Sequence, residues 1–274
     1  MFVKGKMFKI KNISIKIAHR KIAAVLYVRR IILSINMKEG IYHGNCIEFM
    51  NEIENNSIDA CITDPPYGIS FQSNRTDIKK PVIENDNYPY IDWIKPLYDK
   101  LKVGGRLICF YRWDVQEYFL NAIKEAGFTV KSQIVWDKVI HGMGDLNGEF
   151  APQHELMIYA TKGRYEFTNN RPKTVYRIKR MNSNEMIHPN EKPVNLLAAI
   201  IRDITNKEEI LIDLFGGSFS TYLAAKQENR KCLSFELSEY YYQLGSKRIS
   251  EGFMPSIFNY AQHINIRTRN CALC

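Results

Sequence analysis

The alternation of apolar and polar positions predicts strands and helices that follow one another along the chain from Ile41. Ile58, Ala60 and Ile62 alternate with polar neighbours, which predicts a strand over 57–63. Further strands are expected at 106–111, 128–136, 154–160, 209–214 and 231–235, and helices at 91–103, 115–126, 193–204 and 239–249, with one more helix ending near Asn229. We therefore expect an α/β fold with a mostly parallel sheet covered on both faces, whose ligands bind beyond the carboxyl ends of the strands.

The strand over 57–63 ends in the segment Asp64-Pro65-Pro66-Tyr67. Each proline fixes its own φ angle and lacks an N–H donor, so the carbonyl groups of Asp64 and Pro65 have no local partner. A stiff turn is the ordinary interpretation of Asp-Pro-Pro by itself. The alternative is a rigid pair of hydrogen-bond acceptors at the ligand-binding edge of the sheet.

A second strand end carries two glycines and an acid. Gly216 and Gly217 permit a tight turn, and Ser218 or Ser220 is expected to cap the helix that follows. Glu236 ends the next strand, about 20 residues after the glycines, where α/β folds place the acid that binds ribose hydroxyls. No Gly-Lys-Ser/Thr follows, which excludes a phosphate loop, and a full GxGxxG is missing, which disfavours a dinucleotide. The pattern therefore favours a nucleoside site.

The composition is that of an ordinary soluble globular protein, with 45% hydrophobic and 24% charged residues over 274 positions. This length is enough for one large α/β domain. No apolar stretch approaches the length of a membrane span. Six cysteines without a secretory signal indicate reduced thiols in a cytoplasm. Cys271 and Cys274 have metal-ligand spacing but no second pair, so we expect no metal site.

The net charge of +9 is carried by residues 1–36, the N-terminal arm. The arm contains nine Lys and Arg residues and no acid, and the 29 acidic residues of the chain balance the basic residues that remain. Phosphate binding, targeting and an upstream extension outside the working domain are competing explanations. Because a domain-like pattern begins at Met37, we favour a dispensable extension over 1–36, and we expect a tail over 253–274.

Several motifs in a fixed order give the chain a close resemblance to a known family. They are DPPY at 64–67, IVWDK at 134–138, HELMIYATKG at 154–163, HPNEKP at 188–193 and FGGS at 215–218. The set resembles the β group of amino-methylating DNA methyltransferases, in which the catalytic motif precedes the cofactor motif, and it covers about 37–252. The resemblance implies a Rossmann-like class I fold with a mostly parallel seven-stranded sheet, dependent on S-adenosylmethionine.

The resemblance also assigns roles to residues. Asp64, Pro65, Pro66 and Tyr67 would form the catalytic motif. An exocyclic amine is a poor nucleophile because its lone pair is delocalised into the ring, and accepting its N–H bonds at Asp64 and the Pro65 carbonyl localises that pair. Tyr67 would offer a flat face to a base rotated out of the duplex. The implied cofactor residues are Asn45, Cys46, Lys192, Asp213, Phe215, Gly216, Gly217, Ser218 and Glu236.

Two positions depart from the family's usual pattern. Phe219 stands where a small residue, often glycine, is usual, and Asn45 stands where aspartate is common. Both lie beside implied cofactor residues, so we expect an altered cofactor turn.

A basic segment over 162–180 lies where this family places target recognition, within an insert expected at about 162–187. A solvated charged hairpin is the ordinary alternative, but the position favours contact with double-stranded DNA. The expected DNA-binding residues are Arg164, Arg171, Lys173, Arg177, Lys179 and Arg180. The loop over 70–87 is a second candidate for DNA contact. The short insert suits a solitary, prophage-type enzyme with a short recognition site.

The expected activity is transfer of a methyl group to the exocyclic amine of adenine in DNA. Cytosine-N4 methylation stays open, although family members with that activity more often carry Ser at the position of Asp64. A non-catalytic DNA-binding protein with the same fold also stays open. Carbon-5 cytosine methylation is excluded because the chain has no Pro-Cys, and protein glutamine methylation is disfavoured because it typically uses Asn in place of Asp64.

The sequence leaves a homodimer and a cognate restriction endonuclease open. His141, His154 and His188 are expected to be structural or to lie beside the cofactor.

Overall fold

The computed structural model describes residues 38–68, 87–142, 146–168, 171–182, 186–188 and 190–252. The N-terminal arm, the C-terminal tail and most of the 70–87 loop lie outside these residues. The strands are β1 (Gly40–His43), β2 (Ile58–Thr63), β3 (Leu101–Tyr111), β4 (Thr129–Asp137), β5 (His154–Thr161), β6 (Val175–Arg177), β7 (Ile210–Asp213) and β8 (Lys231–Glu236). The helices are α2 (Cys46–Met50), α3 (Ile94–Lys100), α4 (Gln116–Ala126), α5 (Val194–Ile204), α6 (Ser220–Gln227) and α7 (Glu239–Ser250), with a 3₁₀ turn η1 (Trp113–Val115).

The described strands form one sheet in the order β1-β8-β7-β2-β3-β5-β4-β6. β5 pairs antiparallel with β3 and with β4, whereas the other neighbouring pairs are parallel. The predicted mostly parallel sheet is therefore confirmed, but the described sheet has eight strands rather than the expected seven. The additional three-residue strand is β6, an edge strand inside the predicted basic segment.

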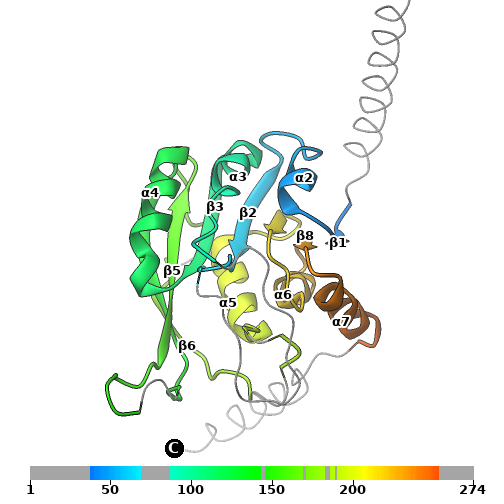
Figure 1. The fold of residues 1–274 in the computed structure, drawn as a ribbon. Coiled ribbons are helices and arrows are strands. Elements are labelled where there is room, and N and C mark those ends of the chain that lie inside the picture. The colour runs from blue at the N-terminus through cyan, green and yellow to red at the C-terminus, as the bar shows by residue number, and fades with distance from the viewer. Residues whose placement is uncertain are drawn as a thin grey trace, which may run out of the picture.

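Helices cover both faces of the sheet (Figure 1). Residues of α2, α3 and α4 form one apolar core with one face, and residues of α5 and α6 form a second core with the other face. β2 lies in the centre and all six of its residues are buried. Its polar Asp59 is buried because it accepts hydrogen bonds from Lys102 at 2.7 Å and from the Ile210 N–H at 2.9 Å. Burial on both faces is typical of a central strand in such a sheet.

Three details of the predicted elements were wrong. The helix predicted over 91–103 ends at Lys100, and β3 already begins at Leu101 and continues through the two glycines at 104–105. β3 begins before the glycines because Leu101 pairs with Ile58 of β2. Gly105 lies in a tight place within β3, where the Lys102 carbonyl would be 2.7 Å from an added Cβ. Neither Ser218 nor Ser220 caps α6, whose N-cap position is taken by Phe219 without a side-chain hydrogen bond.

Candidate active site

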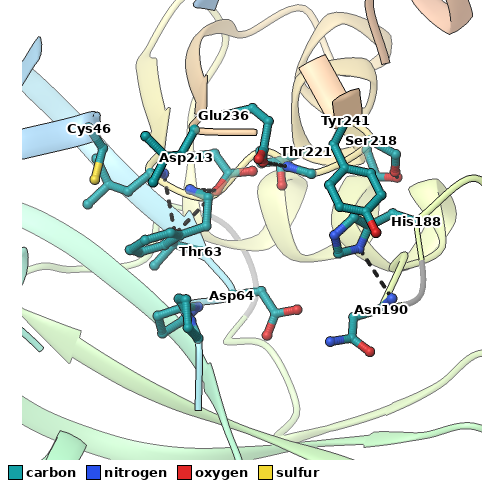
Figure 2. A pocket seen from close by; sticks show the side chains of 18 of the residues that line it. Cys46, Thr63, Asp64, His188, Asn190, Asp213, Ser218, Thr221, Glu236 and Tyr241 are labelled. Atoms are coloured by element: carbon teal, nitrogen blue, oxygen red, sulfur yellow. Dashed lines mark hydrogen bonds between the residues drawn. The ribbon is translucent and has the colours of Figure 1, made fainter. Parts of the chain in front are cut away.

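A pocket opens at the carboxyl ends of β2, β7 and β8. Asp64 follows β2, Asp213 ends β7 and Glu236 ends β8, so three carboxylates face one cavity (Figure 2). The opposite wall comes from the HPNEKP segment and from α7, which contribute His188 and Tyr241. The structure thus brings the predicted catalytic and cofactor motifs together around one cavity, although they are far apart in the sequence.

Asp64 lies at the centre of a charged cluster. The Lys192 ammonium donates to Asp64 Oδ2 at 2.6 Å, and the Tyr67 hydroxyl donates to Asp64 Oδ1. Lys192 Nζ also lies 3.1 Å from Glu155 Oε2, and Lys138 Nζ lies 3.1 Å from Glu155 Oε1. The ion pairs therefore connect Asp64, through Lys192 and Glu155, to Lys138 at the end of β4.

The cluster sets the charges of its members. Burial raises the pKa of Asp64 above its ordinary value, and Lys192 opposes that rise. Burial alone would lower the pKa of Lys192, but the two carboxylates outweigh burial and raise it, so Lys192 is fully protonated. For Glu155, burial would raise the pKa, yet Lys192 and Lys138 outweigh it and the pKa lies below its ordinary value. Lys192, predicted as a cofactor residue, therefore contacts the carboxylate of Asp64, the predicted catalytic residue.

The rest of the DPPY motif is rigid. The Pro66 carbonyl accepts from the Tyr90 N–H at 3.1 Å, which fixes the segment to the chain beyond the undescribed loop. The Tyr67 ring packs edge-on against Phe119, with ring centroids 6.4 Å apart. Pro65 is buried, and the described residues provide no hydrogen bond to its carbonyl. The Asp64 carboxylate thus accepts from Lys192 and Tyr67 at the strand end, and its role with the Pro65 carbonyl as acceptors for a substrate stays a prediction.

The glycine turn and Glu236 meet as expected for a nucleoside site. Glu236 Oε2 accepts from the Gly217 N–H at 2.7 Å, and Glu236 Oε1 accepts from the Ser238 N–H at 2.8 Å. Gly217 has a φ of +53°, a conformation that favours glycine. Burial raises the pKa of Glu236 to about 7, and the two N–H donors oppose the rise.

Asp213 links the catalytic strand to the cofactor turn. Its Oδ1 accepts from the Thr63 hydroxyl at 3.2 Å and from the Phe215 N–H at 3.2 Å. Burial raises its pKa to about 6, although Thr221 and the Phe215 N–H oppose the rise. Phe215 lines the pocket and packs edge-on against Tyr90, with ring centroids 5.9 Å apart.

Phe219 leaves the cofactor side of the turn open. Its φ is +60°, its side chain is fully buried, and it does not line the pocket. The ring packs behind the turn, where a Cβ on Gly216 would lie 2.6 Å from Phe219 Cδ1 and a Cβ on Gly245 would lie 2.5 Å from Phe219 Cδ2. Gly245 of α7 therefore makes room for the large residue, and the side chain points away from the cavity.

Asn45, the second departure from the family pattern, caps α2. Its side-chain oxygen accepts from the Ile47 N–H at 2.9 Å, which is a role that aspartate and asparagine fill equally well. Asn45 and Cys46 both line the pocket. Burial raises the pKa of the Cys46 thiol to about 12, so the thiol is neutral.

The wall formed by the HPNEKP segment is fixed by a buried ion pair. Arg248 Nη1 lies 2.9 Å from Glu191 Oε1, and both side chains are almost fully buried. Arg248 also donates to the Ser218 carbonyl and hydroxyl, each at 3.2 Å. The Glu191 carboxylate accepts from the Ile187 N–H at 3.0 Å. Arg248 thus connects α7, the glycine turn and the HPNEKP segment, and Ser218 contacts it while lining the pocket.

The basic segment divides between two ends of the sheet. Arg164 is 86% exposed, pairs with Glu166 at 2.7 Å and has its carbonyl beside Gly104, near the amino end of β3. Arg171 and Lys173 line a second hollow with Thr129 at the start of β4. Arg164 therefore lies at the opposite end of the strands from Asp64, whereas Lys173 lies within about 14 Å of Arg177 because only four residues separate them. Only the predicted DNA-binding residues of β6 and beyond, Arg177, Lys179 and Arg180, lie at the carboxyl end of β4.

Sequence reasoning missed several residues of the site. Lys138 and Glu155 lie in the quoted motifs IVWDK and HELMIYATKG, but their proximity depends on the antiparallel register of β4 and β5, in which Glu155 lies opposite Trp136. Thr63 could have been found because it immediately precedes Asp64 on the predicted strand. Tyr241 packs on the His188 ring, with centroids 4.4 Å apart, and carried no signal except its position on α7. His188 lies beside the pocket, whereas His141 and His154 are exposed residues bounding the β4–β5 loop.

Within the described ranges, no cluster of His, Cys, Asp and Glu side chains has the arrangement of a metal site. The helices of the same ranges include none that is long and apolar enough to span a membrane.

Comparison with known proteins identifies the family. A family model described as DNA methylase, of the N6/N4 type, matches residues 58–247. The chain belongs to this N6/N4 DNA methylase family. It is 31% identical over 211 residues to the Escherichia coli K12 protein YubD, whose name describes a methylase, covering 76% of this chain and 88% of YubD. It is 26% identical over 264 residues to the type II methyltransferase M.HpaI of Haemophilus parainfluenzae, covering 86% of this chain and 80% of that enzyme.

Solved methyltransferases share the fold. The cytosine-N4-specific PvuII DNA methyltransferase superposes with a TM-score of 0.64 at 20% identity, covering 85% of this chain and 93% of that one. The complex of M1.HpyAVI with S-adenosylmethionine superposes with a TM-score of 0.62 at 24% identity, covering 76% and 98%. The Rossmann-like methyltransferase fold expected from the sequence is therefore confirmed.

The cofactor of this DNA methyltransferase is S-adenosylmethionine, and the pocket residues fit it. The cofactor carries positive charge on its sulfonium and ammonium groups, and the cavity presents the carboxylates of Asp213 and Glu236. Glu236 would accept ribose hydroxyl bonds, and Phe215 provides an aromatic surface. A Cβ added to Gly217 would lie 3.5 Å from the His188 ring, and both residues line the pocket.

Proposed function

We propose that the protein methylates the exocyclic amino group of adenine in double-stranded DNA at a short specific sequence. The observation that supports this most is the placement of Asp64, whose carboxylate lies at the end of β2 with Lys192 and Tyr67 on its two oxygens. Each carboxylate oxygen has two acceptor positions, so each can still accept an N–H bond of a base.

The residues of the chain would act on the amine rather than on the methyl group. S-adenosylmethionine supplies an electrophilic methyl carbon on a sulfonium sulfur. Asp64 and the Pro65 carbonyl would accept the two N–H bonds of the amine, which concentrates the lone pair on nitrogen. As nitrogen forms its new bond it must lose one proton, and the ionised Asp64 is the adjacent group that can take it. Lys192 keeps Asp64 ionised against the effect of burial.

A covalent mechanism finds no support among the described thiols. Cys46, Cys61, Cys109 and Cys232 are all buried and free. Burial raises the pKa of each of these thiols, so none is a thiolate at neutral pH. Direct transfer to the amine therefore remains the proposed chemistry.

Adenine is proposed over cytosine because Asp64 occupies the first position of the motif, where cytosine-N4 enzymes of this family more often have Ser. The test is to incubate the protein with unmethylated DNA and labelled cofactor, digest the DNA to nucleosides and identify the product by mass spectrometry. We expect N6-methyladenine, absent with Asp64→Ala. N4-methylcytosine as the main product would overturn the base assignment, and absence of any methylated base together with absence of cofactor binding by calorimetry would favour a non-catalytic DNA-binding protein.

We also propose that the working unit comprises residues 37–252, and that it acts in a cytoplasm. A homodimer and a cognate restriction endonuclease stay open, and long-read sequencing of DNA from cells that express the gene would give the recognition sequence.

A further inference from the structure

Large apolar side chains are exposed together in the β4–β5 loop, described at 138–142 and 146–153. Phe150 is 100% exposed, Leu146 is 75% exposed and Ile140 is 42% exposed. In Figure 1 the loop projects beyond the sheet near β6. A concentration of exposed apolar side chains on a protein of this class indicates a contact surface.

The base of the loop is held in one conformation. Asp137 Oδ1 accepts from the Val139 N–H at 2.8 Å and from the Gln153 side chain at 2.9 Å. The Lys138 N–H donates to the Gln153 carbonyl at 2.9 Å. Val139 has a φ of +67°, which a β-branched residue rarely adopts. The loop is therefore fixed at its base while its apolar side chains face outward.

The loop begins at the catalytic cluster. Lys138, its first residue, pairs with Glu155, and Glu155 pairs with the Lys192 that contacts Asp64. The base of the loop is therefore connected by ion pairs to Asp64, on the edge of the sheet where the pocket opens.

Exposed cations flank the same loop. The Arg180 N–H donates to the Lys138 carbonyl at 3.3 Å, and Arg177 Nε lies 3.5 Å from Asp137 Oδ2. Arg177, Lys179 and Arg180 are all exposed. The surface thus combines an apolar projection with a basic border, which is the combination that suits a nucleic acid duplex, whose base stack is apolar and whose backbone is anionic.

We propose that residues 146–150 of the β4–β5 loop enter the DNA base stack at the position from which the target nucleotide is rotated, with Leu146 and Phe150 filling the gap. Arg177, Lys179 and Arg180 bind the neighbouring phosphates. Apolar side chains inserted between base steps are an established way for proteins to unstack and bend DNA. This inference rests on the proposed function, because it assumes a duplex whose target base enters the pocket.

The test compares two variants with controls at the opposite end of the sheet. Leu146→Ser/Phe150→Ser removes the projection, and its control is Val103→Ser, a 78% exposed residue on β3. The triple variant Arg177→Gln/Lys179→Gln/Arg180→Gln removes the basic border, and its control is Arg164→Gln. The readouts are duplex binding by fluorescence anisotropy at several salt concentrations, cofactor affinity by calorimetry, and fluorescence of 2-aminopurine placed at the methylated position of a duplex.

With the serine double variant we expect the 2-aminopurine signal and the methyl transfer rate on duplex DNA to fall about tenfold or more, with cofactor affinity unchanged. With the triple variant we expect weaker duplex binding and a salt-dependence slope smaller by roughly 2.7. Wild-type signal and rate in the double variant, or equal losses in the two controls, would overturn the proposal. A wild-type protein that binds duplex DNA without transferring methyl would overturn the proposed function instead.

Discussion

Lys192 Nζ lies 2.6 Å from Asp64 Oδ2, although 128 positions separate the two residues in the sequence. The ammonium of Lys192 donates to the same carboxylate to which we propose that the amine of the base donates. Lys192 therefore opposes the effect of burial on the pKa of Asp64 and favours the ionised carboxylate that we propose binds the amine.

Replacing Lys192 should shift the pH dependence of the reaction. In Lys192→Met, burial and the charge of Glu155 would raise the pKa of Asp64 further, because the main opposing charge is gone. Since activity needs ionised Asp64, the acidic limb of the pH–rate profile should move to higher pH. Steady-state kinetics across pH would measure it. Lys231→Met is the control, because Lys231 pairs only at the surface with Glu208 at 3.4 Å. An unmoved acidic limb would contradict the assigned role.

Asp64 should be required for chemistry but not for cofactor binding. We expect Asp64→Ala and Asp64→Asn to lose about 10²–10³ or more in turnover, the usual effect of removing one group that stabilises a transition state. Cofactor affinity should change little, because the partners of Asp64 are Lys192 and Tyr67 rather than the glycine turn. Methyl incorporation and calorimetry measure the two quantities. Asp64→Asn preserves the shape of the side chain, so retained activity in Asp64→Asn would count against an ionised acceptor.

Cofactor affinity and stability should respond to pH in opposite directions. The pKa of Glu236 is raised from 4.5 to about 7 and that of Asp213 from 3.8 to about 6. At a pH between the unfolded and the folded pKa of each group, the folded protein binds more protons than the unfolded chain. The free energy of unfolding without cofactor should therefore rise as pH falls from about 8 toward about 5. Protonated Glu236 accepts ribose hydroxyl bonds poorly, so cofactor affinity should fall over the same range.

Glu236→Gln provides the matched comparison. Calorimetry and chemical denaturation across pH should show a flatter response of both quantities in this variant than in the wild type. Identical pH responses in the two proteins would show that Glu236 is not the titrating group.

Phe219 and Gly245 should behave as a pair. In Gly245→Ala, the new methyl group would lie 2.5 Å from Phe219 Cδ2, so we expect a loss of about 1–3 kcal/mol in the free energy of unfolding together with weaker cofactor binding. Adding Phe219→Leu should recover part of both losses. Thermal denaturation and calorimetry would measure them. Equal stability of Gly245→Ala and the wild type would show that the ring can move away at no cost.

A chain that begins at Met37 should fold and methylate DNA, because the residues of the site lie between Gly44 and Arg248. Circular dichroism and methyl incorporation are the measurements. Loss of folding, or weaker duplex binding with a smaller salt slope, would assign a function to the basic arm.

The sequence was informative wherever a local pattern determines local structure. The strand before Asp64 and the helix that ends at Gly127, with a φ of +107°, follow from periodicity and glycine alone. The meeting of Asp64 with the glycine turn followed from the rule that parallel strands share a ligand-binding edge.

What could not be predicted depends on packing between distant segments. The start of β3 at Leu101 depends on pairing with Ile58, which overrides the helical pattern before it. The division of the basic segment follows from the parallel pairing of β6 with β4, which no composition reveals. The effect of Phe219 depends on a glycine on another helix.

The buried thiols give the protein an internal chemical reporter. Cys61, Cys109 and Cys232 lie on central strands, so a soluble alkylating reagent can reach them only when the sheet opens. Cys46 lies on the pocket wall, so its alkylation depends in addition on opening around α2. With Cys271 and Cys274 replaced by serine, the rates of modification, resolved by peptide mapping, would separate local opening of the cofactor pocket from global unfolding.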